Sequence, residues 1–351
     1  MLISLQGWRM EGCLEQERFA LLQLKHFFNN PNRLQDWKSG IRGVVPKCFF
    51  AFSLPRIGDT LLNGNLIAGC VENEGFERLS HLDNLVDLDL SYNMFNDSRI
   101  LPGLSKHSSL KHLSLAYNQF GELNHFNVSG LSNLEKLSLS GNMFNNNNIL
   151  SYVSTLSSLT ELNLIDIGLK GTVDLQELDS LSCLEALHMG GIEIKKIVIS
   201  KGETSLGNLT RLYLSTMNIS DGRSLLQTLG LFPSLMAVEI RYNNFRGAVT
   251  TYELNNVTNV KEFRIYDSTL HISFLQSIGA FMSLESLRMD DCEVSGVLTD
   301  QELRSFKNLK TFWMYGIVFH NNFFQVIAAM TSVQTITILS SNISETLLDQ
   351  G

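Results

Sequence analysis

Long apolar runs, basic charge and catalytic motifs are all lacking in this chain of 351 residues. A membrane-spanning helix needs a run of about 18 or more apolar residues, and none occurs, so no span is expected. The formal net charge is -8 and the calculated pI about 5.5, which disfavours nucleic acid as a partner. Proline and cysteine are sparse, at five residues each.

The chemistry of an enzyme is missing from the sequence patterns as well. HExxH, GxSxG, Walker A and GxGxxG do not occur, and the eight histidines lack the spacing of metal ligands. A lone histidine such as His188 is expected to be a surface residue and not a general base. The sequence therefore predicts no enzyme, no cofactor and no metal site.

One pattern recurs along most of the chain. In "LEKLSLSGNMF" from Leu134, apolar residues stand at offsets 0, 3, 5 and 10 and an asparagine at offset 8. About eleven copies follow one another at intervals of 24 to 26 residues. They begin at Leu85, Leu110, Leu134, Leu159, Leu184, Leu209, Leu235, Val260, Leu284, Leu309 and Val333. This period and the form LxxLxLxxNxL match the leucine-rich repeat.

The spacing predicts a short strand in each repeat. Side chains alternate along a strand, so offsets 3 and 5, such as Leu137 and Leu139, point inward, and offsets 2, 4 and 7 face outward. Stacked repeats then form an α/β fold: a right-handed, curved solenoid, or horseshoe, with one parallel sheet of about eleven strands on its concave face.

An asparagine amide at offset 8 can satisfy the backbone groups that an inward turn leaves unpaired. Asn93, Asn118, Asn142 and Asn243 fit such a ladder, and Cys292 is an accepted substitute. The sequence departs from the pattern at Ile167, Ile192, Met217, Ser268, Ile317 and Ser341. The middle and the end of the array are therefore expected to be less regular than its start.

Two further features carry a family resemblance. Three repeats continue with "GTVDLQEL", "GAVTTYEL" and "GVLTDQEL", which resemble the plant type of leucine-rich repeat without its proline. The segment "CLEQERFALLQLKHFFNNPNRLQDW" resembles the helical N-terminal cap of plant leucine-rich-repeat receptors. Its matching residues are Cys13, Glu17, Arg18, Ala20, Leu21, Leu22, Lys25, Leu34 and Trp37. Together they make the chain similar to the ectodomain of a plant receptor-like protein.

The resemblance implies a disulfide between Cys13 and Cys48, an oxidising compartment, and no assured partner for Cys70. The alternative is that all five cysteines, including Cys183 and Cys292 inside repeats, are buried thiols. Four Asn-x-Ser/Thr sequons are glycosylation candidates, at Asn96, Asn127, Asn256 and Asn342. Those at Asn208 and Asn218 are expected to be the least reachable.

The expected organisation has four parts. Residues 1–12 are a possible remnant of a signal peptide, 13–37 the cap, 38–84 an irregular segment, and 85–351 about eleven repeats with the last incomplete. This layout is expected for a shortened form of a longer receptor, which would lie at the cell surface or outside the cell.

The strand face changes character from the sixth repeat onward. Early repeats place small residues there, whereas later repeats place aromatic, arginine and acidic residues, which binding hot spots use. The candidate ligand-binding residues are Tyr213, Glu239, Arg241, Tyr242, Arg264, Tyr266, Asp267, Arg288, Asp290, Asp291, Trp313 and Tyr315. The alternative is a solvated face on which Arg264 and Arg288 pair with acids of neighbouring strands.

Three function classes fit these observations. The resemblance implies a receptor-like ectodomain that binds a peptide, protein or carbohydrate in plant defence or development and signals through a co-receptor or adaptor kinase. The second class is a secreted inhibitor of the polygalacturonase-inhibitor type. The third is an intracellular adaptor, which free thiols throughout would favour.

The array should be most stable in its regular first repeats. Amide hydrogen exchange, followed by mass spectrometry, is expected to be slow between Leu110 and Leu164 and fast from about Val333 onward, because the sequence shows no C-terminal cap. Fast exchange is also expected for 38–72, which matches neither cap nor repeat. Uniform protection through residue 351 would contradict this expectation.

Overall fold

The computed structural model divides into two compact units, residues 1–143 and 144–351. The described residues are 59–61, 63–64, 85–96, 100–105, 107–121, 128, 130–144, 147–219, 222–245, 259–279, 281–296, 306–320 and 330–344. Within these ranges no helix combines the length and the apolar character that crossing a bilayer requires.

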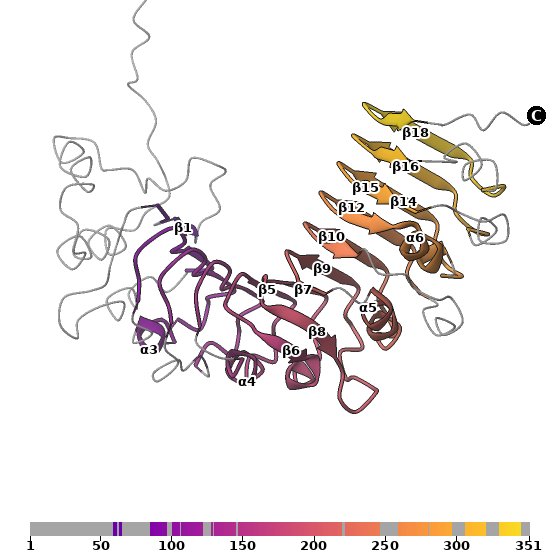
Figure 1. Cartoon of the computed structure of the whole chain (residues 1–351). Coiled ribbons are helices and arrows are strands. Elements are labelled where there is room, and N and C mark those ends of the chain that lie inside the picture. Colours follow the sequence, from indigo (N-terminus) through magenta and orange to yellow (C-terminus); the bar gives the residue numbers. More distant parts are fainter. Residues whose placement is uncertain are drawn as a thin grey trace, which may run out of the picture. The chain divides into compact units, whose positions relative to one another are not determined.

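The first unit contains four short parallel strands that neighbour one another in chain order (Figure 1). They are β1 (Asp59–Leu61), β2 (Asp87–Asp89), β3 (His112–Ser114) and β4 (Lys136–Ser138). A single turn of helix, α3 (Ile100–Leu104), follows β2. Leu88, Leu113 and Leu137 stand in register on the three later strands, so their side chains form one buried layer.

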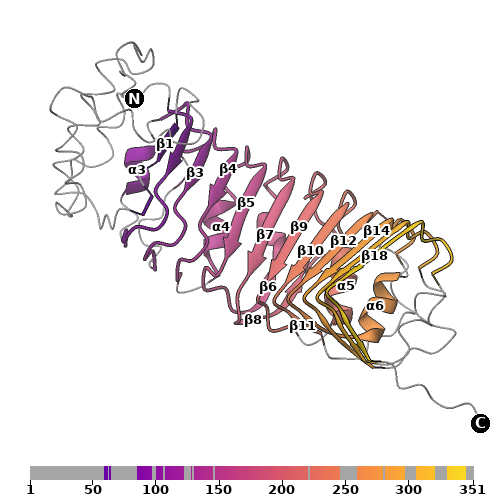
Figure 2. The same cartoon turned by 90° about the horizontal axis from the view of Figure 1, so that it is seen from above.

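The second unit stacks eight parallel strands, again in chain order (Figure 2). They are β5 (Glu161–Ile165), β7 (Ala186–Gly190), β9 (Arg211–Ser215), β10 (Ala237–Arg241), β12 (Glu262–Tyr266), β14 (Ser286–Asp290), β16 (Thr311–Tyr315) and β18 (Thr335–Leu339). These strands form the strand face of the second unit.

The return segments of the second unit form further elements that the sequence did not predict as sheets. A five-stranded parallel sheet comprises β11 (Asn244–Phe245), β13 (Thr269–His271), β15 (Glu293–Ser295), β17 (Val318–His320) and β19 (Asn342–Ser344). A two-stranded sheet comprises β6 (Gly171–Asp174) and β8 (Ile194–Val198). The helices are α4 (Ile149–Val153), η3 (Leu175–Leu178), α5 (Gly222–Leu229) and α6 (Ile272–Gly279). Figure 1 shows α5 and α6 on the side of their repeats away from β10, β12 and β14.

This arrangement confirms the predicted leucine-rich-repeat solenoid. Each of the eleven predicted strands begins two residues after its predicted repeat start, and the strands described within each unit pair in parallel. Leu137 and Leu139 are 3% and 0% exposed, as the period-2 pattern requires. Burying a leucine contributes roughly 2 kcal/mol, and the inward positions repeat this contribution along both units.

The strand β1 was not predicted, since it lies within the segment 38–84 that was expected to be irregular. Its pairing of Asp59 with Asp87 aligns "IGDTLLNGNLI" with "LVDLDLSYNMF" in sequence. Thr60 therefore stands where the later repeats have the first leucine of the strand, so this repeat does not match the leucine pattern. The remaining part of that segment, the cap 13–37, and Cys13, Cys48, Cys70, Asn127 and Asn256 lie outside the described residues.

Every described repeat turns through a left-handed residue at offset 7, directly after the strand. Glycine occupies this position at Gly64, Gly141, Gly191 and Gly316. Other residues hold positive φ there: Tyr92, Tyr117, Asp166, Thr216, Tyr242, Asp267, Asp291 and Ser340. Such a conformation is unusual for bulky or β-branched side chains, so the fold imposes it on these residues.

The asparagine at offset 8 secures that turn. The Asn118 amide nitrogen donates to the carbonyls of Leu90 and Leu115, at 3.0 Å each, and its oxygen accepts from the Phe95 amide at 3.0 Å. The Asn142 side chain makes the same contacts one repeat later, to Leu115, Leu139 and Phe120. The predicted ladder is therefore confirmed, with Asn93 and Asn243 also buried.

The departures from asparagine are accommodated in different ways. Ser268 accepts from the Asn243 amide and donates to the Tyr266 carbonyl, and the Cys292 thiol donates to the Ile265 and Asp290 carbonyls. Burial raises the pKa of Cys292 to about 12, which keeps it a neutral thiol. In contrast, Ile192 is 73% exposed. The ladder is broken in that repeat.

Two of the predicted glycosylation candidates lie within the described residues. Asn96 is exposed, and the backbone of Asn342 belongs to β19. Asn208 and Asn218 are exposed too, contrary to the expectation that they would be the least reachable. The Asn208 amide nitrogen donates to the Ser182 carbonyl of the preceding repeat at 2.8 Å.

Replacing one ladder amide should destabilise the first unit. Asn118→Ala removes the buried acceptor of the Phe95 amide and one of the two donors to the Leu90 carbonyl, which also accepts from Asn93; this should cost about 1–3 kcal/mol of unfolding free energy. Urea denaturation followed by circular dichroism measures this loss. Gln119→Ala, at the adjacent exposed position, is the control and should change stability by less than about 0.5 kcal/mol. Equal effects would show that the ladder does not stabilise the turn.

Candidate binding surface on the strand face of the second unit

The predicted binding residues fall into two columns across the strand face. In the central column Tyr213, Glu239, Arg264, Arg288 and Trp313 stand in register on successive strands. They share a face because each stands between two inward-facing core residues of its strand.

The neighbouring column lies two residues further along the same strands. It contains Arg241, Tyr266, Asp290 and Tyr315, in register on β10, β12, β14 and β16. The columns predicted for Arg264, Arg288 and Trp313 and for Tyr266 and Tyr315 are both confirmed by this register. We call the nine residues of the two columns the aromatic–arginine surface.

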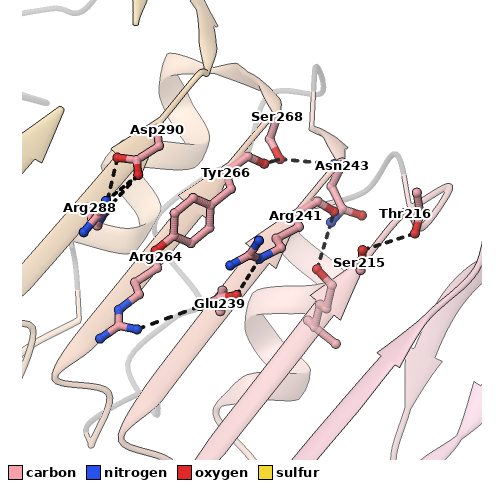
Figure 3. Close-up of polar contacts among 11 residues, drawn as sticks. Ser215, Thr216, Glu239, Arg241, Asn243, Arg264, Tyr266, Ser268, Arg288 and Asp290 are labelled. Carbon is pink, nitrogen blue, oxygen red and sulfur yellow. Dashed lines mark hydrogen bonds and ion pairs between the residues drawn. The ribbon is translucent and has the colours of Figure 1, made fainter. Parts of the chain in front are cut away.

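Each arginine of this surface is paired with an acid, mostly along its own strand (Figure 3). Arg241 Nε contacts Glu239 Oε1 at 2.6 Å, and Arg288 Nη2 contacts Asp290 Oδ2 at 2.6 Å. Arg264 contacts Glu262 at 2.7 Å and reaches Glu239 across the strands at 3.9 Å. The paired-charge alternative expected Arg288 to pair with acids of neighbouring strands. Its partner Asp290 lies on the same strand instead.

Asp267 and Asp291 do not take the role that the paired-charge alternative gave them. Among the described residues neither forms an ion pair with an arginine. Both hold the left-handed position at offset 7 and are exposed, as is Tyr242. The three side chains therefore line the edge of the surface where the strands end.

Two of the three guanidinium groups, those of Arg241 and Arg288, also lie over aromatic rings. Arg241 is 4.4 Å from the Tyr266 ring centroid, and Arg288 is 5.8 Å from the same ring and 5.2 Å from that of Trp313. Cation–π contacts of this kind contribute about 0.5–1 kcal/mol at exposed sites. Ion pairs and rings together fix the arginines before any ligand arrives.

Trp313 is half-buried, and not the fully exposed aromatic that the sequence suggested. Its indole Nε1 is buried without a hydrogen-bond partner among the described residues. An unpaired buried donor costs about 1–3 kcal/mol. A ligand acceptor that reached this atom would recover part of that cost.

His188, expected from the sequence as a surface residue of the strand face but not counted among the binding residues, extends the surface by one strand. It pairs in register with Tyr213, and the two rings stack with centroids 4.0 Å apart and an interplanar angle of 3°. Its Nε2 lies 3.5 Å from Glu161 Oε1. The signal that could have found it is its place at offset 4, one repeat before Tyr213.

The protonation states follow from burial and pairing. Burial lowers the pKa of His188 below its ordinary value, against the opposing effect of Glu161. Burial also raises the pKa of Tyr266, and the hydrogen bond to Asp290 raises that of Arg288. At neutral pH the surface therefore presents fixed guanidinium charges, a neutral His188 imidazole and a neutral Tyr266 phenol. Among the described residues no group of His, Cys, Asp and Glu side chains could hold a metal ion.

No family model matches the chain. Over 286 residues it is 26% identical to Cuscuta receptor 1 of Solanum lycopersicum, and this match covers 71% of the chain. It covers only 22% of the relative, so the chain spans about a fifth of that protein's length.

Solved structures show the same fold at low sequence identity. An internalin of Listeria monocytogenes matches with a TM-score of 0.51 and 17% identity over 81% of both chains. The mouse RP105/MD-1 complex matches with a TM-score of 0.52 and 15% identity, covering 82% of this chain and 51% of the other. These structures support the leucine-rich-repeat fold alone. The resemblance to a plant leucine-rich-repeat receptor is confirmed by the sequence match.

The stability of the second unit should depend on pH through His188. Because burial holds its folded pKa below the ordinary 6.5, the unfolded chain binds the proton first as pH falls, and stability is lost from about pH 6.5 downward. Glu161, Arg211, Tyr213 and Glu239 surround the ring and stay unchanged in the test. His188→Gln should lose less stability than the parent between about pH 7 and 5.5, measured by urea unfolding. Equal losses in both proteins would contradict this assignment.

Proposed function

We propose that the chain is part of the ligand-binding ectodomain of a plant cell-surface receptor-like protein. The observation that carries the proposal is the aromatic–arginine surface, which concentrates the side chains that interfaces favour on one rigid sheet. The match to a plant receptor supports the class of protein.

The dimensions of the surface suit an extended peptide or a protein loop. Five strands from β9 to β16 span about 19 Å, at about 4.8 Å between neighbours. An extended segment of about six residues has this length. We infer a peptide or protein ligand; a carbohydrate is the second possibility that the surface chemistry allows.

Preorganisation favours binding on this surface. An arginine offers five N–H donors, and Arg288 directs Nε and one terminal nitrogen to Asp290. The remaining donors can bind ligand carbonyl or carboxylate oxygens without reorientation of the side chain. Little side-chain entropy is then lost on binding, and that loss is one of the main costs of association.

The rest of the proposal concerns the parent protein. Ligand binding outside the cell would be coupled to a co-receptor or adaptor kinase, in defence or in development. The cap and the Cys13–Cys48 disulfide belong to this proposal as well, as does glycosylation at Asn96 and Asn342.

Truncating the central aromatic should weaken binding. A library of random dodecapeptides displayed on phage is selected on the purified chain, and affinities of selected peptides are measured by calorimetry. Trp313→Ala and Arg288→Ala should each weaken binding by at least about 2 kcal/mol, roughly thirtyfold. Ser114→Ala and Ser138→Ala, in the first unit, should leave affinity unchanged within about twofold.

Two outcomes would overturn this assignment. The first is an equal loss in both groups of variants. The second is loss of folding in the Trp313 variant, judged by circular dichroism, which would make Trp313 a core residue. Inhibition of a purified fungal polygalacturonase by the chain, abolished by the same two variants, would favour the secreted inhibitor instead.

A further inference from the structure

Two tyrosines on the first unit form an exposed aromatic stack that the sequence analysis overlooked. Tyr92 and Tyr117 hold offset 7 of consecutive repeats, and their rings are 4.5 Å apart with an interplanar angle of 12°. They are 57% and 48% exposed. Early repeats therefore offer more than the small residues that were expected of them.

Among the described residues, the Tyr117 ring has a neighbour on each of its faces, whereas the Tyr92 ring has a neighbour on one face. The Tyr117 ring lies between Tyr92 and Gly141, where an added Cβ would come within 2.4 Å of the Tyr117 Cδ1 atom. Tyr92 has one face against Tyr117, so an exposure of 57% requires that its opposite face and its edge reach solvent. That opposite face points toward the preceding strand.

The preceding strand leaves room for a further flat group. Gly64 is the offset-7 residue of the repeat that contains β1, and its amide donates to the Ser91 carbonyl at 3.0 Å, next to Tyr92. It has no side chain, and among the described residues no atom lies within 4 Å of the position that a Cβ would occupy. Within the described part of the chain, the open face of Tyr92 over Gly64 therefore has room for one further flat group.

The charge around this position favours a cation. The described residues 85–96 of the repeat that contains Tyr92 include Asp87 and Asp89 and no lysine or arginine. Asp87 is engaged with His112. Asp89 accepts from the Ser91 amide at 2.9 Å, so its carboxylate lies beside the backbone that leads to Tyr92.

A comparable group of side chains occurs in the second unit, one offset earlier in the repeat, because Arg241 and Tyr266 stand at offset 6. There Arg241 lies 4.4 Å from the Tyr266 ring centroid while its Nε contacts Glu239 at 2.6 Å. A planar guanidinium is placed between a tyrosine face and a carboxylate. In the first unit the tyrosine face and the carboxylate are present, and the described residues supply no guanidinium.

We propose that the open face of Tyr92, over Gly64, binds the guanidinium group of an arginine side chain in a peptide or protein ligand, with Asp89 as the counter-ion. This subsite goes beyond the function proposed above and does not depend on the aromatic–arginine surface. Its geometry selects a flat cation over a tetrahedral ammonium, because a guanidinium can stack on the ring along its whole face.

The test uses the full chain with 13C-labelled tyrosine rings and two matched probes. N-acetyl-arginine methylamide is titrated against its neutral, planar counterpart, N-acetyl-citrulline methylamide, and the Tyr92 signal is assigned with Tyr92→Phe. The Tyr92 shift should saturate with the arginine probe, and the citrulline probe should bind at least about threefold more weakly. Asp89→Asn should weaken the arginine probe by about two- to fivefold.

A second variant separates the ring from its surroundings. Tyr92→Leu keeps Tyr117 covered but removes the aromatic face, and it should abolish saturable binding of the arginine probe. Tyr152→Leu, at an exposed tyrosine of α4, is the control and should leave binding unchanged. Equal binding of both probes, or binding retained in Tyr92→Leu, would overturn the proposal. It would also be overturned if methyl β-D-glucopyranoside shifted the Tyr92 signal and the arginine probe did not.

Discussion

Each repeat of this chain has to turn its backbone inward directly after a strand of three to five residues. Every described repeat makes the turn with a left-handed residue at offset 7, and a polar side chain at offset 8, where the repeat has one, satisfies backbone groups that are carried into an apolar interior. Asn118 links its own repeat to the preceding one in this way. The alignment of strands, and therefore the composition of the strand face, follows from this connection.

The strand face inherits its order from the core beneath it. Since Ile265 and Met289 are fixed in register inside, Arg264 and Arg288 are fixed in register outside. The shortest ion pairs, with Glu239, Glu262 and Asp290, run along the strands. Across the strands Arg241 and Arg288 contact aromatic rings, and Arg264 reaches Glu239. The side chains of this surface are therefore connected in both directions.

The fold could be predicted from the sequence because a fixed period constrains every repeat at once. The predicted starts, the inward leucines and the asparagine ladder all follow from one pattern. The strand β1 was not predicted, because Thr60 weakens the pattern. The sheet of β11, β13, β15, β17 and β19 was not predicted although its strands begin at offset 9 of their repeats and share an apolar residue at offset 10, because a stretch this short shows no alternation. Which residues belong to the two columns could be predicted from the alignment of the repeats.

The sequence predicts which residues line the candidate surface better than it predicts the contacts between their side chains. Whether Arg288 pairs with Asp290 or with Asp267 depends on rotamers, which a sequence pattern does not encode. The stacking of His188 on Tyr213, and of Tyr92 on Tyr117, depends on residues 25 positions apart being brought side by side. A reading of single repeats treats each of these residues as isolated.

The variation in repeat length has a consequence for how such a chain can change. Successive repeats differ in length between 24 and 26 residues, yet offsets 0 to 8 keep their alignment, so the extra residues are absorbed in the return segments. Duplication or exchange of a whole repeat therefore inserts one new row of outward side chains without disturbing the rows on either side. Recognition can be revised one row at a time while the interior stays continuous.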